Sequence, residues 1–144
     1  MNPTASRLPI LKIDGSALHT RTVGDIPETY VAARLLERGL TVCKPIGDDC
    51  RFDLVVYDGE RFYRVQCKMA IRDKKHRGVL RFATKSNAGH YAGQIDYFGV
   101  YWPEERRVYL VPVDECGRSE GYLRLAPAAN GQTAGVRLAE AFAV

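Results

Sequence analysis

The sequence predicts a single α/β (α+β) domain in which one early helix is followed by strands joined by hairpins. Apolar side chains recur most clearly at helical spacing between residues 25 and 39. The later apolar runs are short, rich in β-branched and aromatic side chains, and bounded by turn residues. The 144 residues contain no internal repeat or low-complexity tract, and this length suits one domain with its own core.

The helix is expected to begin at Asp25, which can cap it, with Pro27 in its first turn. It is expected to end at Gly39, because glycine readily adopts the backbone conformation that stops a helix. Residues 1–24 show no clear period. We therefore expect residues 1–24 to form an N-terminal arm and residues 25–144 to form the folded domain.

Seven strand-like runs follow the helix. Asp58-Gly59, between the second and third runs, is a turn signal typical of a hairpin. Residues 86–93 are polar and contain glycine, which favours a loop or short helix, and residues 136–142 suit a short C-terminal helix. The expected strands are residues 41–46, 52–57, 61–69, 79–84, 96–102, 107–113 and 122–125.

The composition is that of an ordinary globular protein, with 46% hydrophobic and 26% charged residues. No apolar run has the length of a membrane span, and the N-terminus lacks the pattern of a signal peptide. We therefore expect a cytoplasmic protein with no membrane partner. The four cysteines form no C-x-x-C pair and no zinc-finger spacing with histidine, so we expect reduced thiols and no zinc.

Positive charge is concentrated in one stretch of the chain. The formal net charge is +4, yet the stretch from Arg61 to Arg81 contains eight basic residues and only one acid. A concentrated basic stripe is the electrostatic pattern expected of a protein that binds phosphate groups. A solvated face of a basic protein would give the same pattern, so both interpretations stay open here.

Glu28 is an acid on the inner face of the expected helix, which it shares with Val31, Ala32 and Leu35. A carboxylate on an apolar stripe is costly unless it is paired or binds a metal. The alternative is an acid in the first turn that is favoured by the helix dipole.

Asp53 interrupts the apolar run of residues 52–57, and acids are depleted from strands. It is therefore either a functional acid or a residue at the start of the strand that bonds to nearby backbone. In the next run, alternation puts Gln66 and Lys68 on one face, with the Cys67 side chain on the other and its backbone carbonyl between them. An edge strand would also explain a lysine at this position.

These residues form an ordered pattern: an acid on a helix, an acid on a strand, a hairpin, and then Q-x-K on the next strand. Magnesium prefers oxygen ligands, with one or two carboxylates and several waters. A divalent cation activates water and neutralises charge on a phosphoryl group. A nearby lysine can orient or deprotonate the attacking water and stabilise an anionic transition state.

The same residues resemble the PD-(D/E)xK nuclease superfamily, in its small branch of intron homing endonucleases and relatives of archaeal Holliday-junction resolvases. The resemblance covers about residues 24–140 and implies a restriction-endonuclease-like central mixed β-sheet flanked by helices. The segments that carry it are GDIPE at 24–28, GDDCRFDLVVY at 47–57, FYRVQCK at 62–68, YAGQIDYFGVY at 91–101 and VYLVPV at 108–113.

The resemblance implies a role for each motif residue. Asp53 corresponds to the first acid of the motif, Gln66 to the (D/E) position, Lys68 to the catalytic lysine and Glu28 to the helical acid. The implied cofactor is Mg²⁺, for which Mn²⁺ can substitute, held by Asp53, Gln66, Glu28 and the Cys67 carbonyl. The sequence departs from the motif twice: Phe52 replaces proline, and Gln66 replaces an acid, which removes one formal negative charge from the site.

The expected partner is double-stranded DNA, and cutting both strands favours a homodimer or homotetramer. The expected function is that of a metal-dependent DNA endonuclease hydrolysing phosphodiester bonds, similar to homing endonucleases. A Holliday-junction resolvase and a catalytically inactive DNA-binding protein are the alternatives. The basic and polar residues expected to contact DNA, each of which could instead be a solvated side chain, are Arg64, Arg72, Lys74, Lys75, Arg77, Lys85 and Ser86.

Overall fold

The computed structural model describes residue 18 and residues 20–144. Its one long helix, α1, spans Thr20–Glu37. Gly39, two residues beyond it, stops the helix with a positive φ of 82° and an N–H bond to the Leu36 carbonyl. The expected start at Asp25 was wrong, and Pro27 lies inside the helix. The turns before Ile26 are exposed, so they carry no apolar period to mark the helix start.

The predicted domain boundary falls within this helix. Residues 20–24 of the expected N-terminal arm belong to α1, and the rest of that arm lies outside the described residues, apart from the exposed Leu18. Pro27 is nevertheless buried, together with Val31 and Leu35, on the face that α1 turns towards the sheet. No helix in the described part of the chain is long and apolar enough to cross a membrane, and all four cysteines are free.

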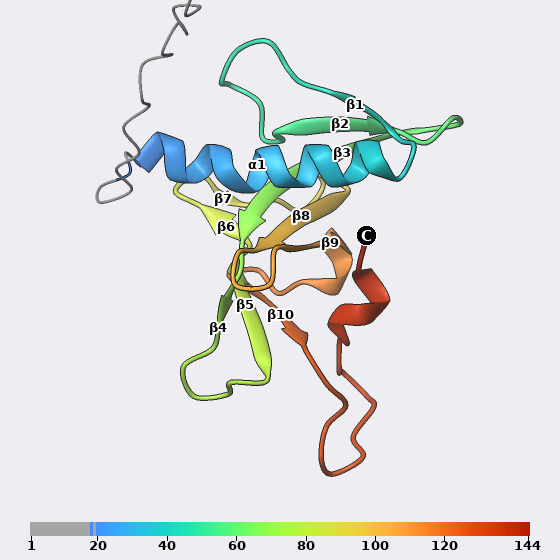
Figure 1. The fold of residues 1–144 in the computed structure, drawn as a ribbon. Helices are drawn as coiled ribbons and strands as arrows, with labels where there is room; N and C mark the ends of the chain where they lie inside the picture. Colours follow the sequence, from blue (N-terminus) through green and yellow to red (C-terminus); the bar gives the residue numbers. More distant parts are fainter. Residues whose placement is uncertain (1–17, 19) are drawn as a thin grey trace, which may run out of the picture.

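A five-stranded sheet in the order β1-β2-β3-β8-β9 forms the centre of the fold. The β3 and β8 strands are parallel, and every other neighbouring pair is antiparallel, so the sheet is mixed, as predicted. The helix α1 lies across one face of it (Figure 1). The strands are β1 (Thr41–Cys43), β2 (Leu54–Tyr57), β3 (Phe62–Met69), β8 (Tyr97–Trp102) and β9 (Arg107–Pro112).

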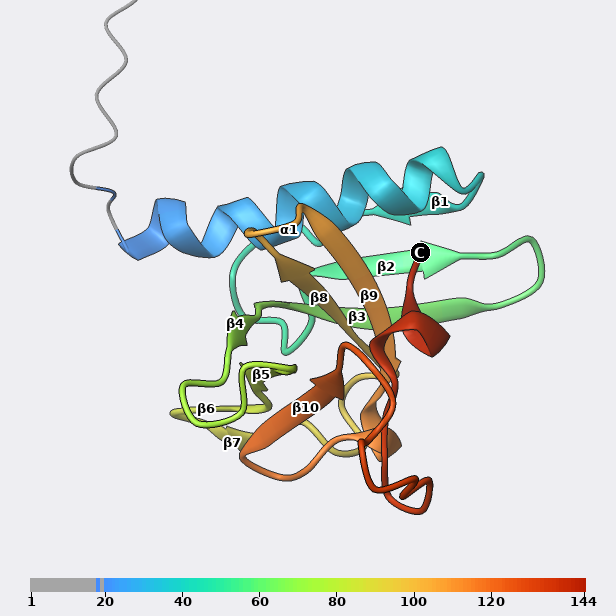
Figure 2. The same ribbon diagram turned by 60° about the horizontal axis from the view of Figure 1, so that its bottom comes forward.

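Smaller elements cover the other face of the central sheet (Figure 2). A three-stranded sheet has the order β10-β5-β4, and β6 pairs with β7 in the segment expected to be a loop or short helix. The expected C-terminal helix is one 3-10 turn. These elements are β4 (Ile71–Arg72), β5 (Val79–Ala83), β6 (Lys85–Ser86), β7 (Gly89–His90), β10 (Glu120–Arg124) and the 3-10 turns η1 (Val113–Glu115) and η2 (Ala139–Phe142).

The alternation of side chains across the sheet divides the core into two parts. On the α1 side, Val31 and Leu35 pack on Val65 and Cys67 of β3. On the other side, β5 and β10 pack on the opposite face of β8 and β9. The helix approaches β8 closely at Gly99, where a Cβ atom would lie 2.7 Å from Val31 Cγ1.

Candidate functional site

Asp53 is attached to β3 by two hydrogen bonds. Its N–H donates to the Val65 carbonyl at 2.9 Å, and its Oδ2 accepts the Cys67 N–H at 2.8 Å. Burial raises the pKa of the Asp53 carboxyl, and the Glu28 charge adds to the rise, whereas the Cys67 N–H and the charges of Lys68 and Lys44 oppose it. Asp53, which directly precedes β2, is therefore within electrostatic reach of both Glu28 and Lys68.

Glu28 reaches the same cleft from α1. Its side chain is only 16% exposed, and its Oε1 lies 2.5 Å from Lys44 Nζ in the loop after β1. This hydrogen bond raises the pKa of the Lys44 ammonium. Glu28, Lys44 and Asp53 all line a small cleft between α1 and the segment that leads into β2. Lys44 is a residue that sequence reasoning missed, because nothing in the chain's pattern links it to Glu28.

Successive side chains in the central part of β3 point to opposite faces of the sheet. Val65 and Cys67 are buried against α1, so alternation directs Gln66 and Lys68 to the opposite face of the sheet. The N–H and C=O of one strand residue point to the same side. Since the Cys67 N–H meets Asp53, the Cys67 carbonyl also faces the side of β3 on which Asp53 lies.

Lys68 extends to Tyr91, a residue just after β7. Its Nζ donates a hydrogen bond to Tyr91 Oη at 3.3 Å and lies 5.0 Å from the centre of the Tyr91 ring. Tyr91 is itself only 4% exposed. The sequence did not indicate this contact, because it joins residues that are 23 positions apart.

Oxygen donors predominate at this site. Within residues 18 and 20–144, no three histidine, cysteine, aspartate or glutamate side chains gather where a metal could bind. The carboxylates of Glu28 and Asp53 line the cleft together and supply two donor groups. The Gln66 amide and the Cys67 carbonyl belong to β3, outside that lining, and would supply neutral oxygens. This donor set fits a hard cation such as Mg²⁺, which accepts carboxylate and carbonyl oxygens and keeps several waters.

Three of the residues expected to contact DNA already bond within the protein. Arg64 forms a two-pronged ion pair with Asp96, Oδ1 at 3.1 Å and Oδ2 at 3.2 Å, and Asp96 also accepts the Arg64 N–H. Arg72 donates to both carboxylate oxygens of Glu104, and Ser86 accepts a bond from Arg51. Asp96 and Arg51 had no predicted role.

The other four expected contact residues are exposed, and the described part of the chain gives none of them an ion-pair partner. Lys74, Lys75 and Arg77 lie in the link between β4 and β5, which extends away from α1 (Figure 1). Lys85 lies in β6.

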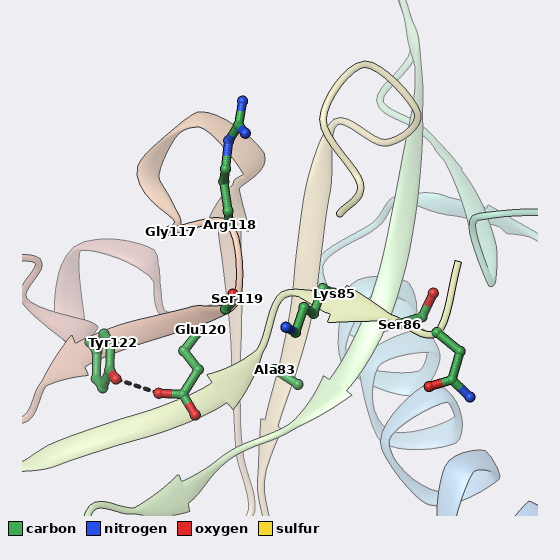
Figure 3. Close-up of a pocket in the computed structure, with 9 residues that line it drawn as sticks. Ala83, Lys85, Ser86, Gly117, Arg118, Ser119, Glu120 and Tyr122 are labelled. Carbon is green, nitrogen blue, oxygen red and sulfur yellow. Dashed lines mark hydrogen bonds between the residues drawn. The ribbon is translucent and has the colours of Figure 1, made fainter. Parts of the chain in front are cut away.

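A groove runs beside β6. Lys85 and Ser86 line it together with Arg118, just before β10, and Glu120, the first residue of β10 (Figure 3). Arg118 is thus a further cation near Lys85 that sequence reasoning missed. No pattern surrounds it, since it stands alone in a turn between Gly117 and Ser119.

The comparisons with known proteins agree with the geometry. A family model described as PD-(D/E)XK endonuclease matches residues 18–144. The fold is similar to that of a bacterial homing endonuclease, I-Ssp6803I, with a TM-score of 0.68 and 23% sequence identity over 88% of each chain. A weaker similarity, with a TM-score of 0.47 and 15% identity, relates 71% of this chain to 84% of Hjc, a Holliday junction resolvase from the archaeal hyperthermophile Archaeoglobus fulgidus. No curated protein sequence matches the chain.

The family match includes α1 and every strand of the central sheet. It therefore includes the helix that carries Glu28, the residue Asp53 just before β2, and the strand β3 that carries Gln66 and Lys68. The resemblance found in the sequence is confirmed, and the chain belongs to the PD-(D/E)XK endonuclease family.

Proposed function

We propose that this protein is a metal-dependent endonuclease that hydrolyses phosphodiester bonds in double-stranded DNA. The observation that carries the proposal is the hydrogen bond from the Cys67 N–H to Asp53, because it fixes an acid beside the strand that presents Gln66 and Lys68. Glu28 and Lys68 both act electrostatically on the same carboxyl. Family membership supports nuclease chemistry at this position.

Asp53, Glu28, the Gln66 amide and the Cys67 carbonyl would hold Mg²⁺, or Mn²⁺ in its place. When bound there, the cation supplies positive charge to the phosphoryl oxygens. Lys68 would orient or deprotonate the attacking water and stabilise the negative charge that develops on the phosphate. The Cys67 side chain is buried and takes no part.

The exposed cations Lys74, Lys75, Arg77 and Lys85 are proposed to bind the DNA backbone. Arg64, Arg72 and Ser86 were expected to do the same, but in this structure each also supports a neighbouring segment. Contacts to phosphate position a protein on DNA and make its affinity depend on salt. Since one site cuts one strand, we further propose that a homodimer or homotetramer cuts both.

Cleavage of a randomised duplex library tests this function, since it contains target sequences that a plasmid can lack. The library and a synthetic four-way junction would be incubated with Mg²⁺ or Mn²⁺ and wild-type protein, Lys68→Ala or the charge-matched control Arg38→Ala, which changes an exposed residue beyond α1. We expect metal-dependent cutting by wild type and Arg38→Ala, and none by Lys68→Ala.

The outcomes separate the three functions that the sequence allowed. Duplex products whose cut ends share a recurring sequence would support the homing-type activity. Preferential cutting of the junction would indicate a resolvase. DNA binding without any metal-dependent cutting would overturn the proposal and leave a DNA-binding protein with a nuclease fold.

A further inference from the structure

The ring of Tyr91 is held on more than one side. The guanidinium carbon of Arg51 lies 4.0 Å from the ring centre, and Phe98 meets the ring edge-on, with ring centres 5.6 Å apart and an interplanar angle of 89°. The ring is buried, and its hydroxyl accepts the hydrogen bond from Lys68 Nζ. Tyr91 therefore has a fixed position relative to the lysine of the Q-x-K motif.

Arg51 fixes the whole segment that carries Tyr91. Its Nε donates to Gln94 Oε1 at 2.6 Å, and Nη1 donates to Ser86 Oγ at 2.7 Å. Its Nη2 donates to the carbonyls of Gly89 and His90 at 3.0 and 3.1 Å. A guanidinium has five donor hydrogens in a rigid fork, and the Arg51 guanidinium donates four hydrogen bonds to this segment. The β6–β7 hairpin and the turn after it are thus tied to Arg51.

Arg51 stands two residues before Asp53 in the sequence. The segment that enters β2 therefore carries Asp53 itself and, through Arg51, also holds Tyr91, the hydrogen-bond partner of Lys68. We propose that Tyr91 is a positioning residue for Lys68, and that Arg51 holds Tyr91 so that Lys68 and Asp53 keep a constant geometry. This inference rests on the proposed nuclease function for its consequence in catalysis.

The chemistry of tyrosine suits this role. Lysine has a long flexible stem and three donor hydrogens, so an unrestrained ammonium samples many positions. A neutral hydroxyl accepts one of those hydrogens and leaves two for water or phosphate. A carboxylate in the same place would offset the positive charge that the transition state needs. Tyr91 would thus restrict Lys68 without neutralising it.

A purely structural role for Tyr91 makes a different prediction. The contacts of Phe98 and Arg51 are made with the ring, so packing should depend on the ring and not on the hydroxyl. Tyr91→Phe removes the hydroxyl and keeps the ring. The matched control is Tyr63→Phe, which changes a tyrosine at the start of the same strand that carries Lys68.

The first measurement is single-turnover cleavage of a duplex that the wild type cuts. Tyr91→Phe should lower the cleavage rate about tenfold, the effect of losing one hydrogen bond to a charged group, with the DNA dissociation constant unchanged. Tyr63→Phe should leave both quantities at the wild-type value. Arg51→Lys, which keeps the charge and loses the fork, should also slow cleavage. An unchanged rate in Tyr91→Phe would overturn the inference.

The second measurement needs no activity. The ammonium signal of Lys68 in a nitrogen–proton NMR spectrum, assigned by its loss in Lys68→Ala, should move towards the signals of exposed lysines in Tyr91→Phe and stay in place in Tyr63→Phe. A Lys68 signal unaffected by Tyr91→Phe would overturn the inference even if the enzyme is active. A wild type that cuts no DNA, with a signal that does move, would instead overturn the proposed function alone.

Discussion

The Asp53 carboxylate accepts the Cys67 N–H at 2.8 Å, which fixes the acid before β2 to the strand that carries Gln66 and Lys68. The same carboxylate faces Glu28 and Lys44 across the small cleft. Asp53 therefore has two separable contributions. One oxygen satisfies a backbone donor, which an amide can also do, while the negative charge is available for a metal.

The first prediction separates these two contributions of Asp53. Asp53→Asn keeps an acceptor for the Cys67 N–H, so its free energy of unfolding should stay close to the wild-type value. Asp53→Ala leaves that donor unpaired and should cost about 1–3 kcal/mol. Both variants should lose DNA cleavage and keep or strengthen DNA binding, because a negative charge near phosphate is gone. Urea unfolding, cleavage and binding assays measure the three effects, and cleavage by Asp53→Asn would contradict the proposed role.

The positions of Asp53, Gln66 and Lys68 could be predicted because they depend on local rules. A hairpin pairs β2 with β3, and strand alternation then sets which side chains share a face. Arg51 and Asp96 could not be found this way. Arg51 meets Gln94 across 43 residues of sequence, and Asp96 meets Arg64 across 32. Those contacts depend on the tertiary fold, which no local pattern encodes.

The second prediction concerns the departure at Gln66. Gln66→Glu adds a carboxylate where the motif has an acid, so the site gains a ligand that a hard cation prefers. We expect Mg²⁺ and Mn²⁺ to bind about tenfold more tightly, as measured by calorimetry on the folded protein. Gln132→Glu, at an exposed position in the C-terminal loop, controls for added charge. Equal metal affinity in both variants would exclude Gln66 as a ligand.

The third prediction concerns the pair formed by Arg64 and Asp96. The hydrogen bond from Arg64 lowers the pKa of the Asp96 carboxyl. A carboxyl whose pKa is lowered by folding stabilises the protein at pH values above its unfolded pKa of about 3.9. This stabilisation is lost as the pH falls through its pKa in the folded protein. Asp96→Asn should therefore unfold more easily than wild type at neutral pH, and the difference should shrink below about pH 4.

Unfolding curves of wild type and Asp96→Asn at several pH values measure this difference. The effect should be smaller than that of a buried pair, since both side chains are more than a third exposed. Glu37→Gln, which alters an exposed pair on α1 with Arg34, serves as the control and should show little dependence. A stability gap for Asp96→Asn that is constant with pH would show that charge is not its cause.

The limits of sequence prediction for the fold have a similar physical origin. The apolar period located the helix because its buried residues, Val31 and Leu35, recur at helical spacing. It missed the helix start because residues 20–25 are exposed and mostly polar, and it missed β6 and β7 because two-residue strands are too short to show alternation. The contact between α1 and β8 at Gly99 was equally invisible, since one small residue in a strand has several explanations.

The fourth prediction follows from that contact. A Cβ atom on Gly99 would lie 2.7 Å from Val31 Cγ1 and 3.1 Å from Val65 Cγ1. Gly99→Ala should therefore push α1 from the sheet and cost about 1–3 kcal/mol of stability. Because Glu28 lies on the same face of α1 as Val31, the shift should also displace it, and cleavage should fall even where the protein is fully folded.

A second substitution provides the decisive comparison for Gly99. Val31→Ala removes both methyl groups that the new Cβ atom would meet on α1, so adding it to Gly99→Ala should recover stability and cleavage relative to Gly99→Ala alone. Gly78→Ala is the matched control, because nothing lies near a Cβ atom at that position. If the double variant were no better than the sum of the two single changes, the helix would not be positioned through Gly99, and the placement of Glu28 would depend on other contacts of α1.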